Sequence, residues 1–395
     1  MNTNLTYLIS GSFGGEVDWS LPILYYLKTR KGVKIRVLLT RNIFKEEAFA
    51  DNKFLASLLL ENVSFVGELY KYLPFYIRTL IWPIRYLAFQ NNSLSTLINK
   101  IWRRIKSLII DKIDIDRIKK DFEADAVAGP GYMFDLFDDG QTKKIDFIEG
   151  SGFAPMEASG SAKCDLIYMN YNYGRFAEGE DKGKYFFGMP KLDYEWRDYL
   201  NNKVSKYAEN IKPKYAGKDV FVLFDRDPKP HLMLKSTRER LVNEAVEIVG
   251  KVPNGRLLIK VHPRNMYKTD KKNGGAEISN EYPPVLAQIA KAVISMSTSA
   301  CLDSIVCGCP TVDYFTFDSA NTLYKPDKNG EIKNEFRSFE LCEKADNKED
   351  LESFINKALN GRYLKDKYID NLSKVFERNG AMKKAAEALY QLLEG

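Results

Sequence analysis

The sequence predicts an α/β protein with two Rossmann-like domains in tandem, whose parallel sheets face an interdomain cleft, and with helices at the C-terminus. Its 395 residues are too many for one ordinary core and fit two domains of about 150–200 residues each. Short apolar runs closed by Gly, Pro or Asn alternate with helical segments, and this alternation occurs twice along the chain. Such repeats are typical of doubly wound parallel sheets, which bind ligands at the carboxyl ends of their strands.

The first alternation fills the N-terminal half and the second begins at Lys218. The strands expected in the first are residues 5–10, 33–40, 62–68, 125–131, 144–152, 164–171 and 184–190, with a helix at 17–32. In the second, we expect strands at 219–226, 256–261, 292–297 and 310–315, and helices at 236–252, 283–292, 299–308, 348–360 and 368–393. The predicted domains are therefore 1–195, with an insert near 70–120, then 216–375, and a closing helix at 376–395.

The cysteine and histidine content argues against a zinc site. None of the five cysteines forms a CxxC pair, and the chain has only two histidines. We expect reduced thiols, a cytoplasmic location and no metal ion. No signal peptide is recognisable, and no run reaches the about 18–20 apolar residues of a membrane-spanning helix.

The excess of positive over negative charge in the chain comes from one segment. Between Glu68 and Asp111 there are seven basic residues and no acidic one, whereas the whole chain has a net charge of +6. From residue 94 to 109, apolar residues keep helical spacing. We interpret this insert as a contact with anionic lipid at the inner face of the cytoplasmic membrane, or as a core-facing helix with a solvated basic side. The membrane candidates are Arg78, Trp82, Arg85, Trp102, Arg103 and Arg104. Nucleic acid is not an expected partner, since no recognised motif accompanies the charge.

The segment "KVHPRN" at 260–265 follows an expected strand. Lys260, Pro263 and Arg264 surround His262, which can donate to a phosphate through one ring nitrogen while the cations add charge. For a lone histidine at the end of a strand, a structural hydrogen bond is the more common explanation.

A second polar group follows the next expected strand along the chain, at 292–297. Ser297, Thr298 or Ser299 can cap the helix that starts there, and its first N–H groups would form an anion site. Asp303, one turn later, is placed to accept from a ribose hydroxyl. The alternative is a serine-rich cap with Asp303 in solvent. Because both groups end strands of one parallel sheet, we expect them on the same edge, and their conjunction favours a phosphate site.

Two further loops carry polar residues. Asp225 and Arg226 end the first strand of the second domain and could face the cleft, although an ordinary polar loop explains them better. In the first domain, Gly14 and Gly15 leave space for an acceptor and precede carboxylates at a helix start. The candidate bases of that domain are Glu16, Asp18 and, on another loop, Glu149. The alternative role for Glu16 and Asp18 is to stabilise the helix start, where a carboxylate interacts favourably with the helix dipole.

The segments "KVHPR" and "STSACLDSIVCGCPTVDY" resemble the nucleotide-binding half of bacterial GT-B-fold glycosyltransferases, over about residues 219–317. The likeness is to capsule and lipopolysaccharide enzymes that use CMP-activated sugars such as Kdo or sialic acids. CDP-glycerol glycerophosphotransferases look similar over the same stretch. The resemblance implies that His262 contacts the donor phosphate and takes part in catalysis, that 297–299 line the phosphate or sugar acid, and that Asp303 lies near the ribose.

The resemblance implies a metal-independent glycosyltransferase that moves a sugar from a nucleotide-activated donor, CMP-linked by this likeness, to a surface-polysaccharide or glycolipid acceptor. A non-hydrolysing UDP-GlcNAc 2-epimerase, a polyol phosphate transferase and a non-catalytic membrane-associated scaffold are the alternatives.

Overall fold

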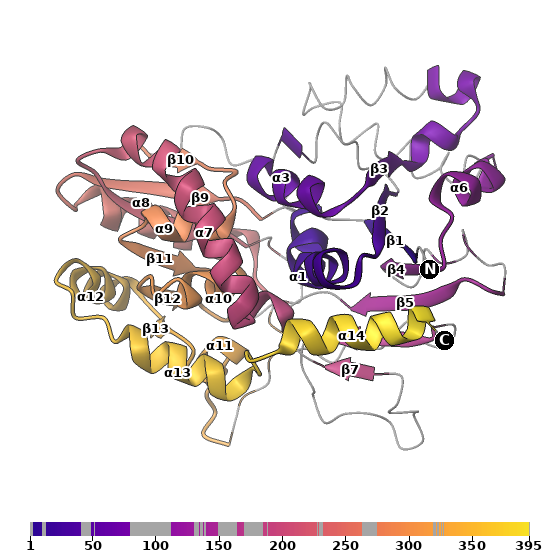
Figure 1. Cartoon of the computed structure of the whole chain (residues 1–395). Helices are drawn as coiled ribbons and strands as arrows, with labels where there is room; N and C mark the ends of the chain where they lie inside the picture. The colour runs from indigo at the N-terminus through magenta and orange to yellow at the C-terminus, as the bar shows by residue number, and fades with distance from the viewer. Residues whose placement is uncertain are drawn as a thin grey trace.

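The computed structural model describes residues 3–9, 13–40, 49–50, 52–79, 112–129, 134, 137, 140–148, 164–169, 185–187, 189–226, 228, 232–262, 275–318, 321, 324, 326 and 328–394. These residues form two α/β domains that lie side by side, joined by a long helix and by the C-terminal segment (Figure 1). The predicted fold class is confirmed. The expected helix within 94–109 lies outside the described residues.

The N-terminal domain is built on a parallel sheet. Within the described residues its strand order is β3-β2-β1-β4-β5-β6-β7. The strands are β1 (Asn4–Ile9), β2 (Lys34–Leu39), β3 (Phe65–Glu68), β4 (Ala126–Gly129), β5 (Lys143–Ile148), β6 (Leu166–Met169) and β7 (Tyr185–Phe187). Between them lie α1 (Phe13–Lys31), α3 (Lys53–Asn62), the 3-10 turn η1 (Leu69–Tyr72) and α6 (Ile115–Phe122). The order reverses between β1 and β4, which is the Rossmann topology.

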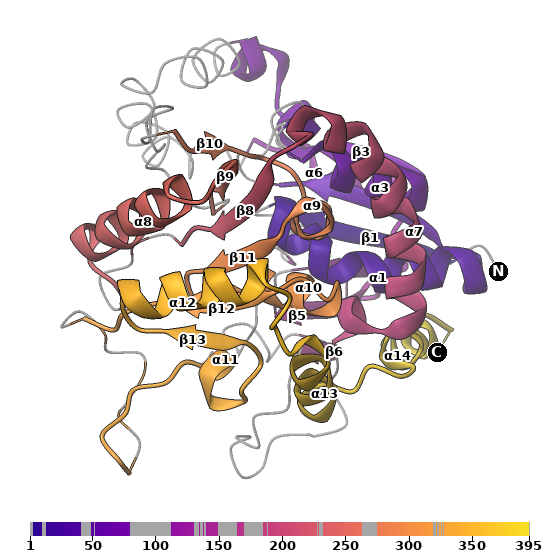
Figure 2. The same cartoon turned by 90° about the vertical axis from the view of Figure 1, so that its left-hand side faces the viewer.

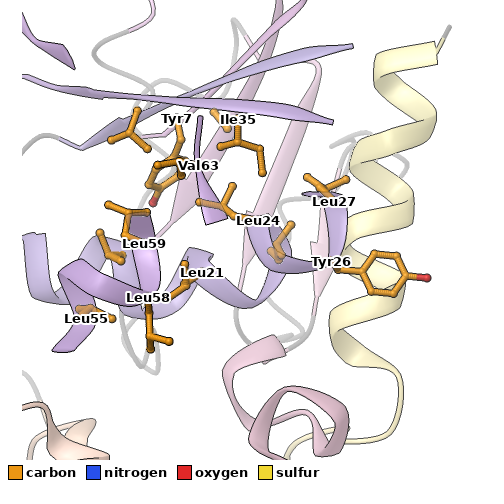
Figure 3. Close-up of a cluster of buried hydrophobic side chains, with 14 of the residues drawn as sticks. Tyr7, Leu21, Leu24, Tyr26, Leu27, Ile35, Leu55, Leu58, Leu59 and Val63 are labelled. Carbon is orange, nitrogen blue, oxygen red and sulfur yellow. The ribbon is translucent and has the colours of Figure 1, made fainter. Parts of the chain in front are cut away.

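One face of this sheet carries the main core of the domain. Side chains of α1 and α3 pack there on residues of β1 and β2, and Figure 3 shows Leu21, Leu24, Leu55 and Leu59 directed at this core. Tyr26 points instead toward the C-terminal helix, where its hydroxyl lies 3.4 Å from Glu387 Oε1. The opposite face is covered by α6 and η1.

The C-terminal domain has a second parallel sheet, in the order β10-β9-β8-β11-β12-β13 among the described residues. Its strands are β8 (Asp219–Phe224), β9 (Gly255–Lys260), β10 (Glu277–Ile278), β11 (Ala292–Ser295), β12 (Thr311–Tyr314) and β13 (Glu343–Ala345). The helices α8 (Lys235–Gly250) and α12 (Lys348–Leu359) cover one face, and α9 (Pro283–Ile289) and α10 (Ala300–Val306) the other (Figure 2). The short α11 (Glu335–Ser338) precedes β13.

Three segments connect the domains. The turn η5 (Pro190–Leu192) leads into α7 (Tyr194–Ile211) and η6 (Lys212–Tyr215) before the second sheet begins. The chain returns through α13 (Lys365–Val375) and α14 (Ala381–Glu394), and α14 packs on α1 beside the N-terminal sheet (Figure 1). The sequence suggested one helix at 368–393. The structure divides it, because α13 ends at Val375, where Phe376 has an extended backbone with φ −118° and ψ 127°, and α14 begins only after Gly380, which has a φ of 74°. No helix among the described residues has the length and apolar character needed to cross a bilayer.

We predict that Trp196→Ala in α7 lowers the free energy of unfolding by about 3–5 kcal/mol, because it removes a large side chain that is 1% exposed and packs against Tyr25 and Tyr199. Urea denaturation measures the change. Leu364→Ala is the control, since Leu364 is 65% exposed, and should change the stability by less than about 0.5 kcal/mol. Equal stability of the two variants would contradict the packing of α7 described above.

Candidate functional site

The strand ends of the C-terminal sheet bring the two predicted phosphate-binding segments together. Phe224 at the end of β8 is in register with Lys260 of β9 on one side and with Ser295 of β11 on the other. The Asp225 amide donates to the Lys260 carbonyl at 3.0 Å. The two segments therefore lie on one carboxyl edge, one strand apart, as the sequence predicts. The order of the sheet reverses at β8, so this edge is also the position where open α/β sheets bind ligands.

Four predicted residues are partly exposed on this edge. Arg226 follows β8, Lys260 and His262 follow β9, and Ser299 begins α10. The Lys260 ammonium donates to the Asn280 carbonyl at 2.8 Å. Ser299 is the N-cap residue, one of the three predicted, and its side chain makes no capping hydrogen bond. Pro263 and Arg264 lie outside the described residues.

The loop before α10 was expected to offer its amides to a phosphate, but in the structure these amides have partners within the domain. The Ser297 amide donates to Asp313 Oδ1 at 2.9 Å, and the Thr298 amide donates to Ser295 Oγ at 3.2 Å. Ser297 is 1% exposed and Thr298 8%. These two amides serve the loop itself, so they are not available as the phosphate donors that the sequence suggested. In addition, α10 spans only seven residues, which limits its dipole.

A buried group of charged residues joins the domains; we call it the interdomain charge cluster. Its members are Asp18, Lys191, Arg197, Tyr282 and Asp303. The Lys191 ammonium lies 2.5 Å from Asp18 Oδ2 and 3.0 Å from Asp303 Oδ2. The Arg197 guanidinium lies 3.1 Å from Asp303 Oδ1, and the Tyr282 hydroxyl donates to Asp18. Asp18 comes from α1 of the first domain and Asp303 from α10 of the second, so the cluster spans the junction.

Burial determines the protonation of this cluster. Burial opposes a charge on Lys191, but the carboxylates of Asp18 and Asp303 outweigh it and raise the pKa of the ammonium. Burial, and then the charge of Asp18, raise the pKa of Tyr282 well above its ordinary value, so the hydroxyl stays a donor. Burial also raises the pKa of the Cys307 thiol, which lies 3.0 Å from an Arg197 nitrogen. Lys191 therefore remains charged between its two carboxylates.

This cluster changes the interpretation of two predicted residues. Asp303 is 1% exposed and both its oxygens contact cations, so it does not present a carboxylate to a ribose in this structure. Asp18 is likewise held by Lys191 and Tyr282 rather than directed at an acceptor. Sequence reasoning treated both residues locally and missed their partners.

The other acceptor-side residues lie at or near the start of α1. Gly14 and Gly15 are partly exposed in its first turn, and Glu16 is 3% exposed. The Glu16 carbonyl accepts from the Tyr7 hydroxyl at 3.0 Å, which ties the start of α1 to β1. Glu149 lies outside the described residues.

Asp225 also has a structural partner. Arg238 of α8 donates through Nε to Asp225 Oδ1 at 2.8 Å and through a second nitrogen to Oδ2. Asp225 is 2% exposed and paired within its own domain, so it does not face a cleft, which was the less favoured of the two interpretations of the sequence. Its neighbour Arg226 acts electrostatically on Glu335 and Tyr324, and the Tyr324 hydroxyl donates to Glu335 Oε2 at 2.6 Å. Burial raises the pKa of Glu335.

The residues that sequence reasoning missed lie outside recognised motifs. Lys191 and Arg197 lie within Met189–Tyr215, the segment in which the sequence predicts the linker between the domains, and Tyr282 precedes a pair of prolines. The only available signal was that two cations stand close to Met189, Pro190 and Trp196, in a linker that is otherwise partly apolar. That signal does not identify the acidic partners.

Comparisons with known proteins show the fold. The sequence matches no protein-family model and no curated protein. The UDP-GlcNAc 2-epimerase of Neisseria meningitidis bound to UDP-GlcNAc is similar with a TM-score of 0.57, at 13% identity, over 98% of this chain and 99% of that one. The S. aureus MnaA structure with UDP is similar with a TM-score of 0.56, at 11% identity, over 100% of this chain and 97% of that one. A glycosyltransferase from Rickettsia africae is similar with a TM-score of 0.51, at 10% identity, over 100% of this chain and 99% of that one. The chain therefore has the GT-B fold.

We predict that Lys191→Met lowers the free energy of unfolding by about 3–5 kcal/mol, because it leaves Asp18 and Asp303 buried without their shared cation. The control is Arg240→Ala, which removes an exposed pair with Glu244 and should cost less than about 1 kcal/mol.

The same variant gives a pH test, measured by urea denaturation. The pKa of Lys191 is raised on folding, so its charge stabilises the folded protein fully at any pH below the pKa in the unfolded chain, about 10.4. This stabilisation is lost only as the pH rises through the pKa in the folded protein. The difference between wild type and Lys191→Met should thus stay constant from about pH 7 to 9. A difference that vanishes within this range would show that Lys191 is not charged in the folded protein.

Proposed function

We propose that this chain is a glycosyltransferase that binds a nucleotide-activated sugar at the carboxyl edge of the C-terminal sheet. The observation that carries the proposal is that Arg226, Lys260 and His262 extend from two adjacent strands at the point where the strand order reverses. A reversal point is the usual ligand site of such sheets, and these side chains suit an anionic ligand. The similar structures from N. meningitidis and S. aureus hold UDP-GlcNAc and UDP, which supports a nucleotide here.

The proposed chemistry is stabilisation of the departing phosphate. Negative charge develops on the phosphate as the bond to the sugar breaks, and fixed cations near it lower the barrier. His262 would donate a hydrogen bond, while Lys260 and Arg226 would supply positive charge. In this proposal the side chains perform the task, without a metal ion. The CMP-linked donor and the polysaccharide or glycolipid acceptor rest on the resemblance over residues 219–317.

The acceptor is proposed to bind at the start of α1, near Gly14 and Gly15. Its hydroxyl must lose a proton, and Glu16 and Asp18 are the candidate bases in the described part of that domain. Glu16 is buried and Asp18 is bound to Lys191 and Tyr282. Asp18 can act as a base only when the domains shift and open its contacts with Lys191 and Tyr282, so we expect domain movement to expose this base.

A second candidate is an epimerase acting on a nucleotide-activated sugar, which the similar UDP-GlcNAc 2-epimerase structure favours. The two reactions differ in their products. A transferase releases free nucleotide and needs an acceptor, whereas an epimerase returns an isomer of the intact nucleotide sugar. Chromatography of the products with and without added acceptor separates them.

Membrane contact is a separate proposal, for residues 75–79 within the charged insert. Phe75 is 73% exposed and Tyr76 is 61% exposed in a helical stretch at 75–79 that also contains Arg78. Exposed aromatic side chains beside cations suit a lipid headgroup layer with anionic lipids. Trp82, Arg85, Trp102, Arg103 and Arg104 lie outside the described residues. We propose that residues 75–79 belong to a surface that binds anionic membranes.

We predict that the wild-type protein binds at least one of CMP, CDP and UDP, and that His262→Ala weakens this binding by about 10- to 100-fold. This is the range expected for losing a hydrogen bond to a charged group. Isothermal titration calorimetry measures both. Lys251→Ala is the control because Lys251 lies exposed at the far end of α8 and should not change the affinity. Absence of binding by the wild type, or an unchanged affinity of His262→Ala, would reject the donor site.

We predict that the protein floats with anionic liposomes and that the double substitution Phe75→Ser and Tyr76→Ser reduces the bound fraction several-fold. The reason is loss of apolar area that enters the headgroup layer, at about 25 cal/mol per Å². Leu364→Ser removes a similarly exposed apolar side chain just before α13, outside residues 75–79, and this variant should bind liposomes like the wild type. Failure of the wild type to float would remove the membrane proposal without affecting the nucleotide site.

A further inference from the structure

One buried side chain connects the loop before α10 to a distant helix cap. Asn334 is 0% exposed and is the N-cap residue of α11, where its Oδ1 accepts from the Arg337 amide at 3.0 Å. Its Nδ2 donates to Ser297 Oγ at 3.0 Å and to Asp313 Oδ2 at 2.8 Å. A helix cap needs only the first of these bonds, so the two donated bonds require another explanation.

The residue that Asn334 contacts has an unusual backbone. Ser297 has a φ of 52°, in the left-handed region that residues other than glycine seldom adopt. Asp313 holds the Ser297 amide and Asn334 holds its hydroxyl. Such a conformation persists only where the surroundings determine it, and it often marks a functional site. Here the surroundings are the side chains of Asp313, near the carboxyl end of β12, and Asn334, at the N-cap of α11.

Arg337 makes this support rigid. Its Nε donates to Asp313 Oδ2 at 2.7 Å, and Nη2 donates to the carbonyls of Phe315 and Ala345 at 2.7 and 3.2 Å. The guanidinium thus balances the buried carboxylate and joins the ends of β12 and β13. Asp313 and Asn334 are therefore fixed relative to the sheet, and they transmit that position to Ser297.

We propose that Asn334 is a positioning residue for the phosphate of the nucleotide donor. By fixing Ser297 in its left-handed conformation, it sets the direction in which Thr298 and Ser299 leave β11 toward the edge that carries His262. The inference rests on the proposed donor site and adds a residue to it that does not itself contact the ligand. It predicts an effect on phosphate binding that exceeds any effect on the nucleoside part.

The chain offers a matched control for a test. Asn347 caps α12 in the same manner, with Oδ1 accepting from the Asp350 amide at 2.9 Å. Serine is about as good an N-cap as asparagine but is too short to reach Ser297. Asn334→Ser should lower the affinity for the nucleotide that the wild type binds by about 10-fold or more, and that for its nucleoside by less than about twofold. Asn347→Ser should change neither affinity.

Calorimetry with each nucleotide and its nucleoside, and a thermal melt of each variant, give the result. If Asn334→Ser keeps the wild-type ratio of nucleotide to nucleoside affinity, or loses both affinities equally, Asn334 does not position the phosphate, and the donor site itself stands. If the wild type binds no nucleotide, the proposed function and this inference both fail. Should Asn334→Ser not fold, Ser297→Ala replaces it, because it removes the hydroxyl that Asn334 holds and leaves the cap of α11 and the contact between Asn334 and Asp313 in place.

Discussion

The relative placement of the two domains depends on one buried ammonium group. Lys191 lies between a carboxylate of each domain, Asp18 and Asp303, and is 2% exposed. A charge this deeply buried is tolerated only when partners compensate for its lost hydration, so each of the three groups requires the other two. Trp19 of α1 lies 4.5 Å from the same ammonium, within apolar packing that includes Leu302 of α10. The junction between the domains is therefore held by buried ion pairs and by the apolar side chains packed around them.

The segment that carries Lys191 also holds the C-terminal helix. Asp193 accepts from the Glu195 amide at 2.9 Å, which begins α7, and from the Met382 amide at 3.0 Å, near the start of α14. Arg378 donates to the Leu192 carbonyl at 3.0 Å. Residues 190–197 thus contact both domains and the returning chain. A movement of the domains has to pass through this short segment, and any such movement that opens the Asp18 contact exposes a carboxylate beside the proposed acceptor site.

The features predictable from the sequence are those set by local pattern. Apolar runs and their spacing gave both sheets, and parallel pairing then placed 260–262 and 295–299 on one edge, because register aligns the strand ends. The fates of the acidic residues were not predictable in the same way. Asp303 meets Lys191 across 112 residues, and Asp225 meets Arg238 only after α8 has folded back on the sheet. In the sequence, a carboxylate near a motif resembles a ligand-binding group. Only the folded structure shows whether that carboxylate is buried and already paired with a cation.

This distinction also changes the physical basis of the proposed phosphate site. A helix end supplies amides that point along one axis, but here the amides of Ser297 and Thr298 are used within their loop. The remaining donors of the edge are side chains from separate strands, among them Lys260, His262 and Arg226. Their convergence depends on the register of β8 with β9 and β11 rather than on any single motif. In the proposed site, recognition therefore depends on the folded sheet, and the buried Asn334 and Arg337 hold the loop before α10 against that sheet.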